Sequence, residues 1–215
     1  MTPLYWNGMP SLASLLARAL ERAGLSSEPG RLEALERYLV LLARWGRRLN
    51  LTAVPEPEHV LERLLPDAFR LARALPPSVH TVIDVGSGSG LIGVPLAVLC
   101  PALELALLEP SAKRCSFLRA AVQQLGLNAT IHEGRLEQLA PGLAALDLAC
   151  CRATWPPAEW LRRAVRLLQG GGQAVAFLAR DAPPSAPGFE LTRVVDYALD
   201  DGSPRRLAFY SRCFT

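Results

Sequence analysis

The sequence predicts an α/β protein with a mostly parallel sheet that ends in an antiparallel C-terminal hairpin, preceded by an N-terminal helical extension. Apolar residues recur at helical spacing from residue 11 to about residue 75. From His80 onward, short apolar runs alternate with helical segments, which is typical of parallel strands joined by right-handed crossovers. The last two strand-like segments are joined by a turn-rich stretch. We therefore expect a helical extension over residues 1–77 and a ligand-binding domain over residues 78–215.

The extension is expected to contain three helices. The first ends at Gly24, because glycine favours helix ends, and Pro76-Pro77 closes the whole segment. Proline at the start of a helix is tolerated because its missing N–H would have no partner there. We expect these helices over residues 11–23, from Pro29 to the Asn50-Leu51-Thr52 segment, and from about Pro57 without interruption through Phe69.

The second part of the chain is expected to form the sheet. Its strands are predicted from short apolar runs, and its helices from apolar residues at a period of 3.6. The expected strands cover residues 80–85, 103–108, 129–132, 146–151 and 173–179, with the hairpin strands at 189–195 and 206–213. The expected helices cover residues 91–99, 111–125 and 156–168.

The segment Asp84-Val-Gly-Ser-Gly-Ser-Gly90 follows an apolar run and precedes a helical pattern. Strand, glycine-rich turn and helix in this order open a nucleotide-binding α/β unit. Glycines at alternate positions remove Cβ atoms where a ligand contacts the backbone, and the next helix offers free N–H groups in its first turn. The candidate cofactor-binding residues of this loop are Asp84, Gly86, Ser87, Gly88 and Gly90, followed by Leu91.

Asp84 distinguishes between two classes of ligand. A carboxylate at this turn has the wrong sign for the pyrophosphate of a dinucleotide, but it suits the ammonium and sulfonium groups of S-adenosylmethionine (SAM). The same loop also fits the dinucleotide pattern G-x-G-x-x-G, and Glu109, after the next strand, would bond ribose hydroxyls in either site. SAM is the expected cofactor; a nicotinamide oxidoreductase and a similar fold with an empty pocket are alternatives.

Composition sets further limits on function. The chain has 215 residues and a net charge of only +3, so its overall charge does not indicate a nucleic-acid partner. Its five cysteines show no C-x-x-C spacing and it has three histidines, so no metal site is expected. No signal peptide and no apolar run of ~20 residues is visible. We expect a reduced, cytoplasmic protein without membrane contact, and a monomer by default.

Six segments occur in the same order as in one known family. They are Leu49-Asn-Leu-Thr-Ala-Val54, the loop 84–95, residues 107–114, Phe117-Leu118, Gly134-Arg-Leu-Glu137 and Cys151-Arg-Ala153. From about residue 35 to the end, the chain resembles the ribosomal RNA small subunit methyltransferase G family, also called GidB. The resemblance implies a class I SAM-dependent methyltransferase with a Rossmann-like sheet. It also implies methyl transfer to N7 of a guanine in bacterial small-subunit (16S) ribosomal RNA or in the ribosomal particle.

The resemblance extends the set of candidate site residues. Glu109 would accept ribose hydroxyls, with help from Ser111, and the Leu136-Glu137 pair would lie beside the adenine. Arg152 follows the fourth strand, at the sheet edge where open α/β sheets bind ligands, and it is the candidate catalytic residue, facing cofactor or substrate.

Basic and aromatic residues near these segments are candidates for contact with RNA. Trp155 is a candidate for stacking on a base, with a core position as the alternative. The basic residues would form a rim around the pocket, or else are solvated surface charges: Arg44, Arg47, Arg48, Lys113, Arg114 and Arg135.

The substrate side departs from the family pattern. Leu64 and Ala68 stand where the family has histidine and serine, and Pro66 lies between them. Cys151 replaces a serine, and a lysine-glycine pair expected near the fifth strand is missing. Two alternatives therefore stay open: a methyltransferase of the same fold with another substrate, and a non-catalytic ribosome-associated protein with a vestigial SAM pocket.

Overall fold

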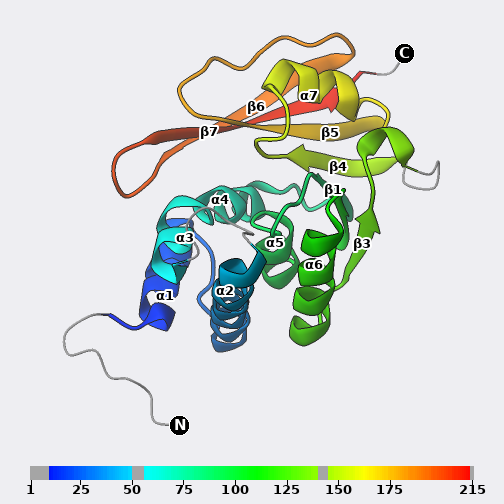
Figure 1. The fold of residues 1–215 in the computed structure, drawn as a ribbon. Helices are drawn as coiled ribbons and strands as arrows, with labels where there is room; N and C mark the ends of the chain where they lie inside the picture. Colours follow the sequence, from blue (N-terminus) through cyan, green and yellow to red (C-terminus); the bar gives the residue numbers. More distant parts are fainter. Residues whose placement is uncertain (1–9, 50–55, 140–144, 214–215) are drawn as a thin grey trace.

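The computed structural model describes residues 10–49, 56–139 and 145–213. Within these ranges, seven strands form one sheet in the order β3-β2-β1-β4-β5-β7-β6 (Figure 1). The strands from β3 to β5 are parallel, and β7 runs antiparallel to both β5 and β6. Their bounds are β1 Thr81–Val85, β2 Glu104–Glu109, β3 Ala129–Glu133, β4 Leu146–Cys151, β5 Leu168–Leu178, β6 Phe189–Ala198 and β7 Pro204–Arg212. The predicted α/β class, with its C-terminal hairpin, is confirmed.

The helices lie before the sheet and in its crossovers. The helices α1 to α4 precede β1, while α5, α6 and α7 follow β1, β2 and β4 in turn. A short 3₁₀ helix, η1 (Leu136–Gln138), lies between β3 and β4. The helix bounds are α1 Leu12–Arg22, α2 Pro29–Leu49, α3 Pro57–Arg63, α4 Pro66–Ala74, α5 Gly93–Leu99, α6 Ala112–Leu125 and α7 Pro157–Ala164. None of the described helices is long and apolar enough to cross a membrane.

Two sequence predictions about these elements were wrong. The expected third helix is two helices, α3 and α4, because Pro66 cannot donate an N–H inside a helix and instead occupies the first turn of α4. Helix α7 ends at Ala164, and β5 begins at Leu168 rather than at residue 173. Leu146 pairs with Leu168 but Leu148 pairs with Gln173, so the intervening glycines form a bulge within β5, in a stretch to which the sequence analysis assigned no element.

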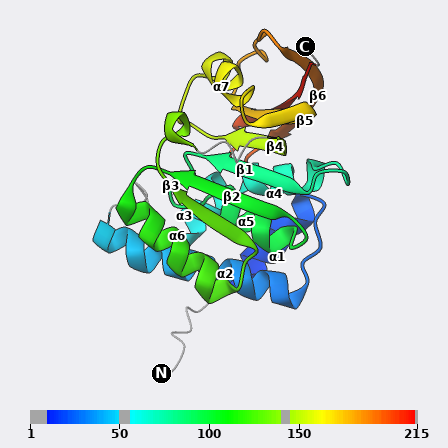
Figure 2. The ribbon, with the colours of Figure 1, turned by 90° about the vertical axis from the view of Figure 1, so that its right-hand side faces the viewer.

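The two faces of the sheet are covered unequally (Figures 1 and 2). Alternate residues of a strand point to opposite faces, so Val82 joins the core that contains α1 to α6, whereas Ile83 joins a smaller core with α7. Trp160 of α7 is 1% exposed, and its Nε1 donates to the Val175 carbonyl at 2.9 Å. The smaller core therefore places α7 firmly over β4 and β5.

The N-terminal helices share a continuous core with the sheet. Buried side chains from α1 to β7 belong to one cluster, which includes Leu16 and Phe209. Tyr38 of α2 is fully buried and donates its hydroxyl to the Ser89 carbonyl at 2.8 Å, so α2 supports the glycine loop. These contacts make the helices part of the scaffold around the loop. The division into domains at residue 77 stays a prediction.

Candidate active site

The glycine loop connects β1 to α5. The N–H groups of Gly86 and Ser87 both donate to the Leu108 carbonyl, at 2.8 and 3.0 Å, so the loop starts where β1 and β2 end. Gly86, Gly88 and Gly90 have φ values of +72°, +60° and +77°, which L side chains rarely adopt. The loop conformation therefore depends on glycine at these positions.

Space around the three glycines differs. A Cβ on Gly86 would lie 2.2 Å from Thr154 Oγ1, and one on Gly90 would lie 2.6 Å from Val94 Cγ2. Within residues 10–49, 56–139 and 145–213, a Cβ on Gly88 would meet only the Gly86 carbonyl, at 3.9 Å. Gly86 and Gly90 therefore allow close packing inside the protein, whereas Gly88 leaves open space above the loop.

Asp84 is buried at the end of β1 and is 2% exposed. Its Oδ2 accepts from the Gly93 N–H at 3.1 Å, so the carboxylate lies at the first turn of α5. Burial raises the pKa of Asp84 to about 6, although the Gly93 N–H and the Arg152 guanidinium act in the opposite direction. The carboxylate that the sequence assigned to a cofactor cation thus already has a structural partner.

We expect Asp84→Asn to stabilise the protein at neutral pH. The native pKa lies above the ordinary value, so the folded state binds a proton that the unfolded state releases between about pH 4 and pH 6. Stability is consequently lost as the pH rises through this window, and a neutral amide avoids that loss. The free energy of unfolding, measured with denaturant, should rise by about 1–3 kcal/mol at pH 7.5.

The same measurement at pH 4 provides the control. At this pH the native side chain at position 84 is neutral in both proteins and the unfolded wild type is only partly ionised, so the two stabilities should agree to within about 1 kcal/mol. An Asp84→Asn protein that is less stable than the wild type at pH 7.5 would show that the carboxylate is net stabilising in its ionised form.

Glu109 holds the loop from the end of β2. It is 2% exposed, and its carboxylate accepts from the Gly88 N–H at 2.8 Å and from the Ser111 N–H at 2.9 Å. Arg114 lies 3.8 Å from the same carboxylate. The structure therefore brings together three residues that the sequence predicted for the cofactor: Gly88, Glu109 and Ser111. Each carboxylate oxygen keeps a second acceptor position for a further donor.

A cavity of about 330 Å³ opens beside this loop. We call it the glycine-loop cavity; its lining includes Gly86 and the predicted Leu136-Glu137 pair, together with Arg135, Thr154, Trp155 and Arg163. Leu136 is buried, whereas Glu137 is exposed and forms an ion pair with Arg163 of α7. This ion pair joins η1 to α7 across the cavity lining.

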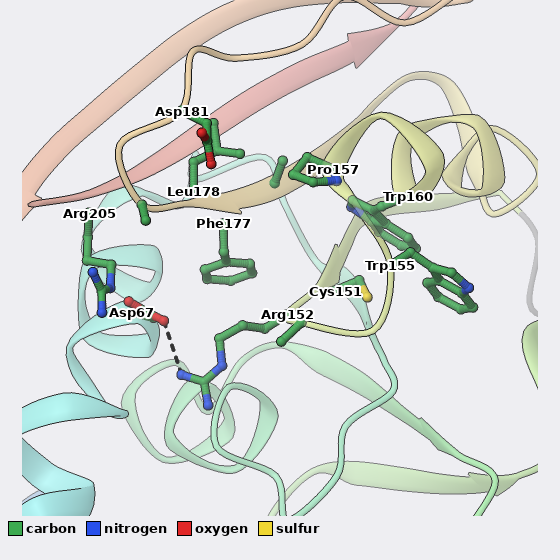
Figure 3. A pocket seen from close by; sticks show the side chains of 13 residues that line it. Asp67, Cys151, Arg152, Trp155, Pro157, Trp160, Phe177, Leu178, Asp181 and Arg205 are labelled. Carbon is green, nitrogen blue, oxygen red and sulfur yellow. Dashed lines mark hydrogen bonds and ion pairs between the residues drawn. The ribbon is translucent and has the colours of Figure 1, made fainter.

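A second cavity of about 390 Å³ lies at the carboxyl ends of β4 and β5, and we call it the β4–β5 cavity (Figure 3). Its lining includes Asp67, Arg152, Trp155, Phe177, Asp181 and Arg205. Trp155 lines both cavities, which therefore adjoin. The ring of Phe177 projects into the β4–β5 cavity above Arg152 (Figure 3).

Arg152 belongs to the β4–β5 cavity. Its Nη1 donates to the Leu64 carbonyl at 2.6 Å and to Asp67 Oδ2 at 3.1 Å. The other oxygen of Asp67 accepts from the Tyr197 hydroxyl at 2.5 Å. Burial and the neighbouring Asp67 raise the pKa of Tyr197, so its hydroxyl remains a donor. This network connects α4, β4 and β6 beneath the cavity.

The departures from the family pattern leave this network intact. Leu64 contributes through its backbone carbonyl, which does not depend on its side chain. Asp67 supplies the carboxylate, and Ala68 is fully buried. Asn50-Leu51-Thr52 and the side chains of Arg47 and Arg48 lie outside the described residues.

The remaining predicted residues lie around the loop. Ser87 is buried and donates its hydroxyl to the Asp84 carbonyl at 2.8 Å, and Leu91 is partly buried against the larger core. Phe177, Tyr197 and Arg163 were not predicted from the sequence. Phe177 sits in an apolar run, and the partners of Tyr197 and Arg163 are far away in the sequence, so no local signal marked them.

The strand order, the glycine loop after β1 and the acidic residue at the end of β2 define a class I SAM-dependent methyltransferase. Solved structures share this fold. The mitomycin 7-O-methyltransferase MmcR has a TM-score of 0.56 at 16% identity, and the match covers 95% of this chain and 74% of the MmcR chain. TrmN from Thermus thermophilus has a TM-score of 0.52 at 24% identity, covering 71% and 53%. M. jannaschii TYW2, solved in complex with AdoMet, has a TM-score of 0.54 at 14% identity, covering 69% and 76%.

Residues 31–182 match the GidB family, described as rRNA small subunit methyltransferase G. A relative of that name from Anaeromyxobacter sp. strain Fw109-5 is 37% identical over 175 residues, which cover 80% of this chain and 81% of the relative. Another, from Stenotrophomonas maltophilia strain K279a, is 38% identical over 169 residues, covering 77% and 76%. The chain belongs to this family, as its sequence motifs suggested, and its cofactor is SAM.

The site residues fit this cofactor. Open space lies above Gly88, and the Glu109 carboxylate lies beside the loop with acceptor positions to spare. The buried Asp84 carboxylate places a negative charge at the start of the loop, which suits a cationic ligand. An open glycine backbone and two separate carboxylates match the chemistry of an adenosine that carries an ammonium and a sulfonium.

Proposed function

We propose that this protein transfers a methyl group from SAM to N7 of a guanine in small-subunit ribosomal RNA. The observation that supports this best is the pair of adjoining cavities, one at the glycine loop and one at the Arg152–Asp67 pair, which share Trp155 as a wall. The family name of the relatives supports RNA as the substrate.

In this proposal the glycine-loop cavity holds the cofactor. Gly86, Ser87, Gly88 and Gly90 contact its methionine and ribose parts through the backbone. Glu109 and Ser111 bind the ribose, Leu136 and Glu137 flank the adenine, and Asp84 offsets the positive charge. When bound, SAM supplies an electrophilic methyl group on a sulfonium.

The chain's own residues then have a positioning task. N7 of neutral guanine carries a lone pair and no proton, so no residue has to remove a proton before transfer. Among the described residues, no histidine lines either cavity. We propose that Arg152 holds the base, because the alignment of the nucleophile with the methyl carbon dominates the rate. The residues that line the two cavities would limit access of water to the reacting atoms.

The RNA backbone would meet basic residues around the cavities. Arg135 lines the glycine-loop cavity and Arg205 lines the β4–β5 cavity. Lys113 and Arg114 lie on the first turn of α6, and the exposed Arg44 lies on α2. We propose that the basic rim suggested by the sequence contacts phosphates. Its described members are Arg44, Lys113, Arg114 and Arg135.

We expect methyl transfer to be salt-dependent. The test incubates the protein with tritiated SAM and small subunits, or the naked ribosomal RNA, from cells that lack this gene. Neutralising two phosphates should weaken binding about tenfold between about 50 and 200 mM salt. Comparison of the two substrates decides between particle and naked RNA. Turnover of a small molecule with no salt response, and none of RNA, would contradict the proposal.

A further inference from the structure

The Arg152–Asp67 pair presents a hydrogen-bond donor beside an acceptor at the β4–β5 cavity. Arg152 Nη1 and Asp67 Oδ2 are 3.1 Å apart, and both residues line the cavity. Nη1 makes both hydrogen bonds of this guanidinium, and within the described part of the chain its Nη2 and Nε have no partner. Asp67 accepts two hydrogen bonds and can accept more.

Of the two purines in ribosomal RNA, only guanine has an N1–C6 edge whose donor and acceptor complement this pair. Guanine presents the N1–H donor next to the O6 acceptor, so a carboxylate and a guanidinium side by side complement it. Adenine presents the opposite order, the N1 acceptor next to the N6 amino donor, and would face donor with donor and acceptor with acceptor. The exocyclic O6 lies between N1 and N7 along the edge of the base. Contacts to N1–H and O6 therefore leave the N7 lone pair free.

We infer that Asp67 and Arg152 together select guanine as the base to be methylated, Asp67 by accepting from N1–H and Arg152 by donating to O6. This inference rests on the proposed function and specifies the contacts of the same site. Tyr197 is a positioning residue, because its hydroxyl holds Asp67 from the side opposite Arg152.

Phe177 supplies the stacking surface for this base. Its ring projects into the cavity near Arg152 (Figure 3). Trp155, the stacking candidate from the sequence, instead lies parallel to Trp160 with ring centroids 6.3 Å apart, and Arg163 lies 4.8 Å over its ring. A base taken out of its stack needs such an aromatic surface, and Phe177 is the one that projects into the space.

Base analogues test the inference with the wild-type protein. The methylated position is first located by strand scission at N7-methylguanine, and ribosomal RNA is then ligated with inosine, 2-aminopurine or adenosine at that position. All three keep N7. Inosine also keeps O6 and N1–H, so its kcat/KM should stay within about fivefold of guanosine. 2-Aminopurine and adenosine lack both, and should lose at least about 100-fold.

The variant Asp67→Asn tests the residue itself. Its amide can donate to an unprotonated N1, so the preference for guanosine over 2-aminopurine should fall at least about tenfold. Asp196→Asn is the matched control, because it replaces a carboxylate by an amide at a site on β6. The Asp196 side chain is 64% exposed and pairs with Arg206. This control should keep the wild-type preference, and thermal melting and SAM binding verify folding of both variants.

The outcomes separate the two proposals. If the wild type transfers no methyl group into guanosine-containing RNA, the proposed function fails. If it does, but uses 2-aminopurine as well as guanosine, or if Asp67→Asn lowers kcat/KM equally for every base, only the inference fails. Should Asp67→Asn not fold, the wild-type analogue series decides alone.

Discussion

Replacement of Gly88 by valine is expected to abolish SAM binding while the protein still folds. A side chain at this position enters the open space above the loop, where, among the residues that the structure describes, only the Gly86 carbonyl lies within 4 Å of a Cβ, at 3.9 Å. Valine at the φ of +60° strains the folded backbone and should lower the free energy of unfolding by about 1–3 kcal/mol. Titration calorimetry measures the affinity, and a variant that binds SAM like the wild type would show that the cofactor lies elsewhere.

Gly126→Val is the matched control for this substitution. Gly126 ends α6 with a φ of +64°, and a Cβ there would meet no atom of the described part of the chain within 4 Å. The backbone strain is therefore similar, but the position is remote from the glycine loop. We expect Gly126→Val to lose comparable stability and to bind SAM normally, which separates strain from the steric effect on the ligand.

Arg152→Ala is expected to lower the single-turnover rate of methyl transfer at least about 100-fold. Loss of the guanidinium removes the group proposed to hold the base, and a misplacement of about 1 Å is enough for such an effect. It also leaves the largely buried Asp67 without its cation and with only the Tyr197 donor, which should lower the free energy of unfolding by about 1–3 kcal/mol. Rapid-quench measurement with saturating SAM gives the rate, and denaturant unfolding gives the stability.

Arg152→Lys separates the two effects. Lysine keeps the positive charge near Asp67 but lacks the planar fork that reaches two partners at once. Most of the stability should return, whereas the rate should stay low. If Arg152→Lys transfers methyl groups at the wild-type rate, residue 152 contributes only its positive charge, and the planar fork of the guanidinium is not required.

The pH profile tests the same mechanism. Because guanine N7 has no proton to lose and arginine stays charged, the single-turnover rate should be nearly flat from about pH 6.5 to 9 in both the wild type and Arg152→Ala. A rate that rises tenfold per pH unit would reveal an obligatory deprotonation and would point to a different acceptor atom.

Local patterns explain why much of the fold could be predicted. Strands β1 and β4 and the helix α6 follow from apolar runs and periodicity within a few residues. The break at Pro66 and the early start of β5 could not be predicted this way. Proline is compatible with either a kinked helix or the start of a new one, and the glycines of β5 form a bulge whose position is set by the pairing of Leu168 and Gln173 with β4.

Part of the candidate site could also be predicted from local patterns, and part could not. The glycine loop and Glu109 were recognised because backbone contacts to a cofactor need particular residues at fixed spacing, and the family motifs confirmed the class of protein. Their individual roles toward SAM stay predictions. The sequence placed Arg152 at the right sheet edge but could not show that it faces the β4–β5 cavity.

The sequence by itself determined the fold class, the family and the cofactor, because each is encoded in contiguous residues. Only the tertiary structure decided which side chains meet around the substrate. Arg152 and Asp67 are 85 residues apart in the chain, and Tyr197 and Asp67 are 130 apart. These partners meet because α4, β4 and β6 converge at one end of the sheet, and the packing of the whole core sets that convergence.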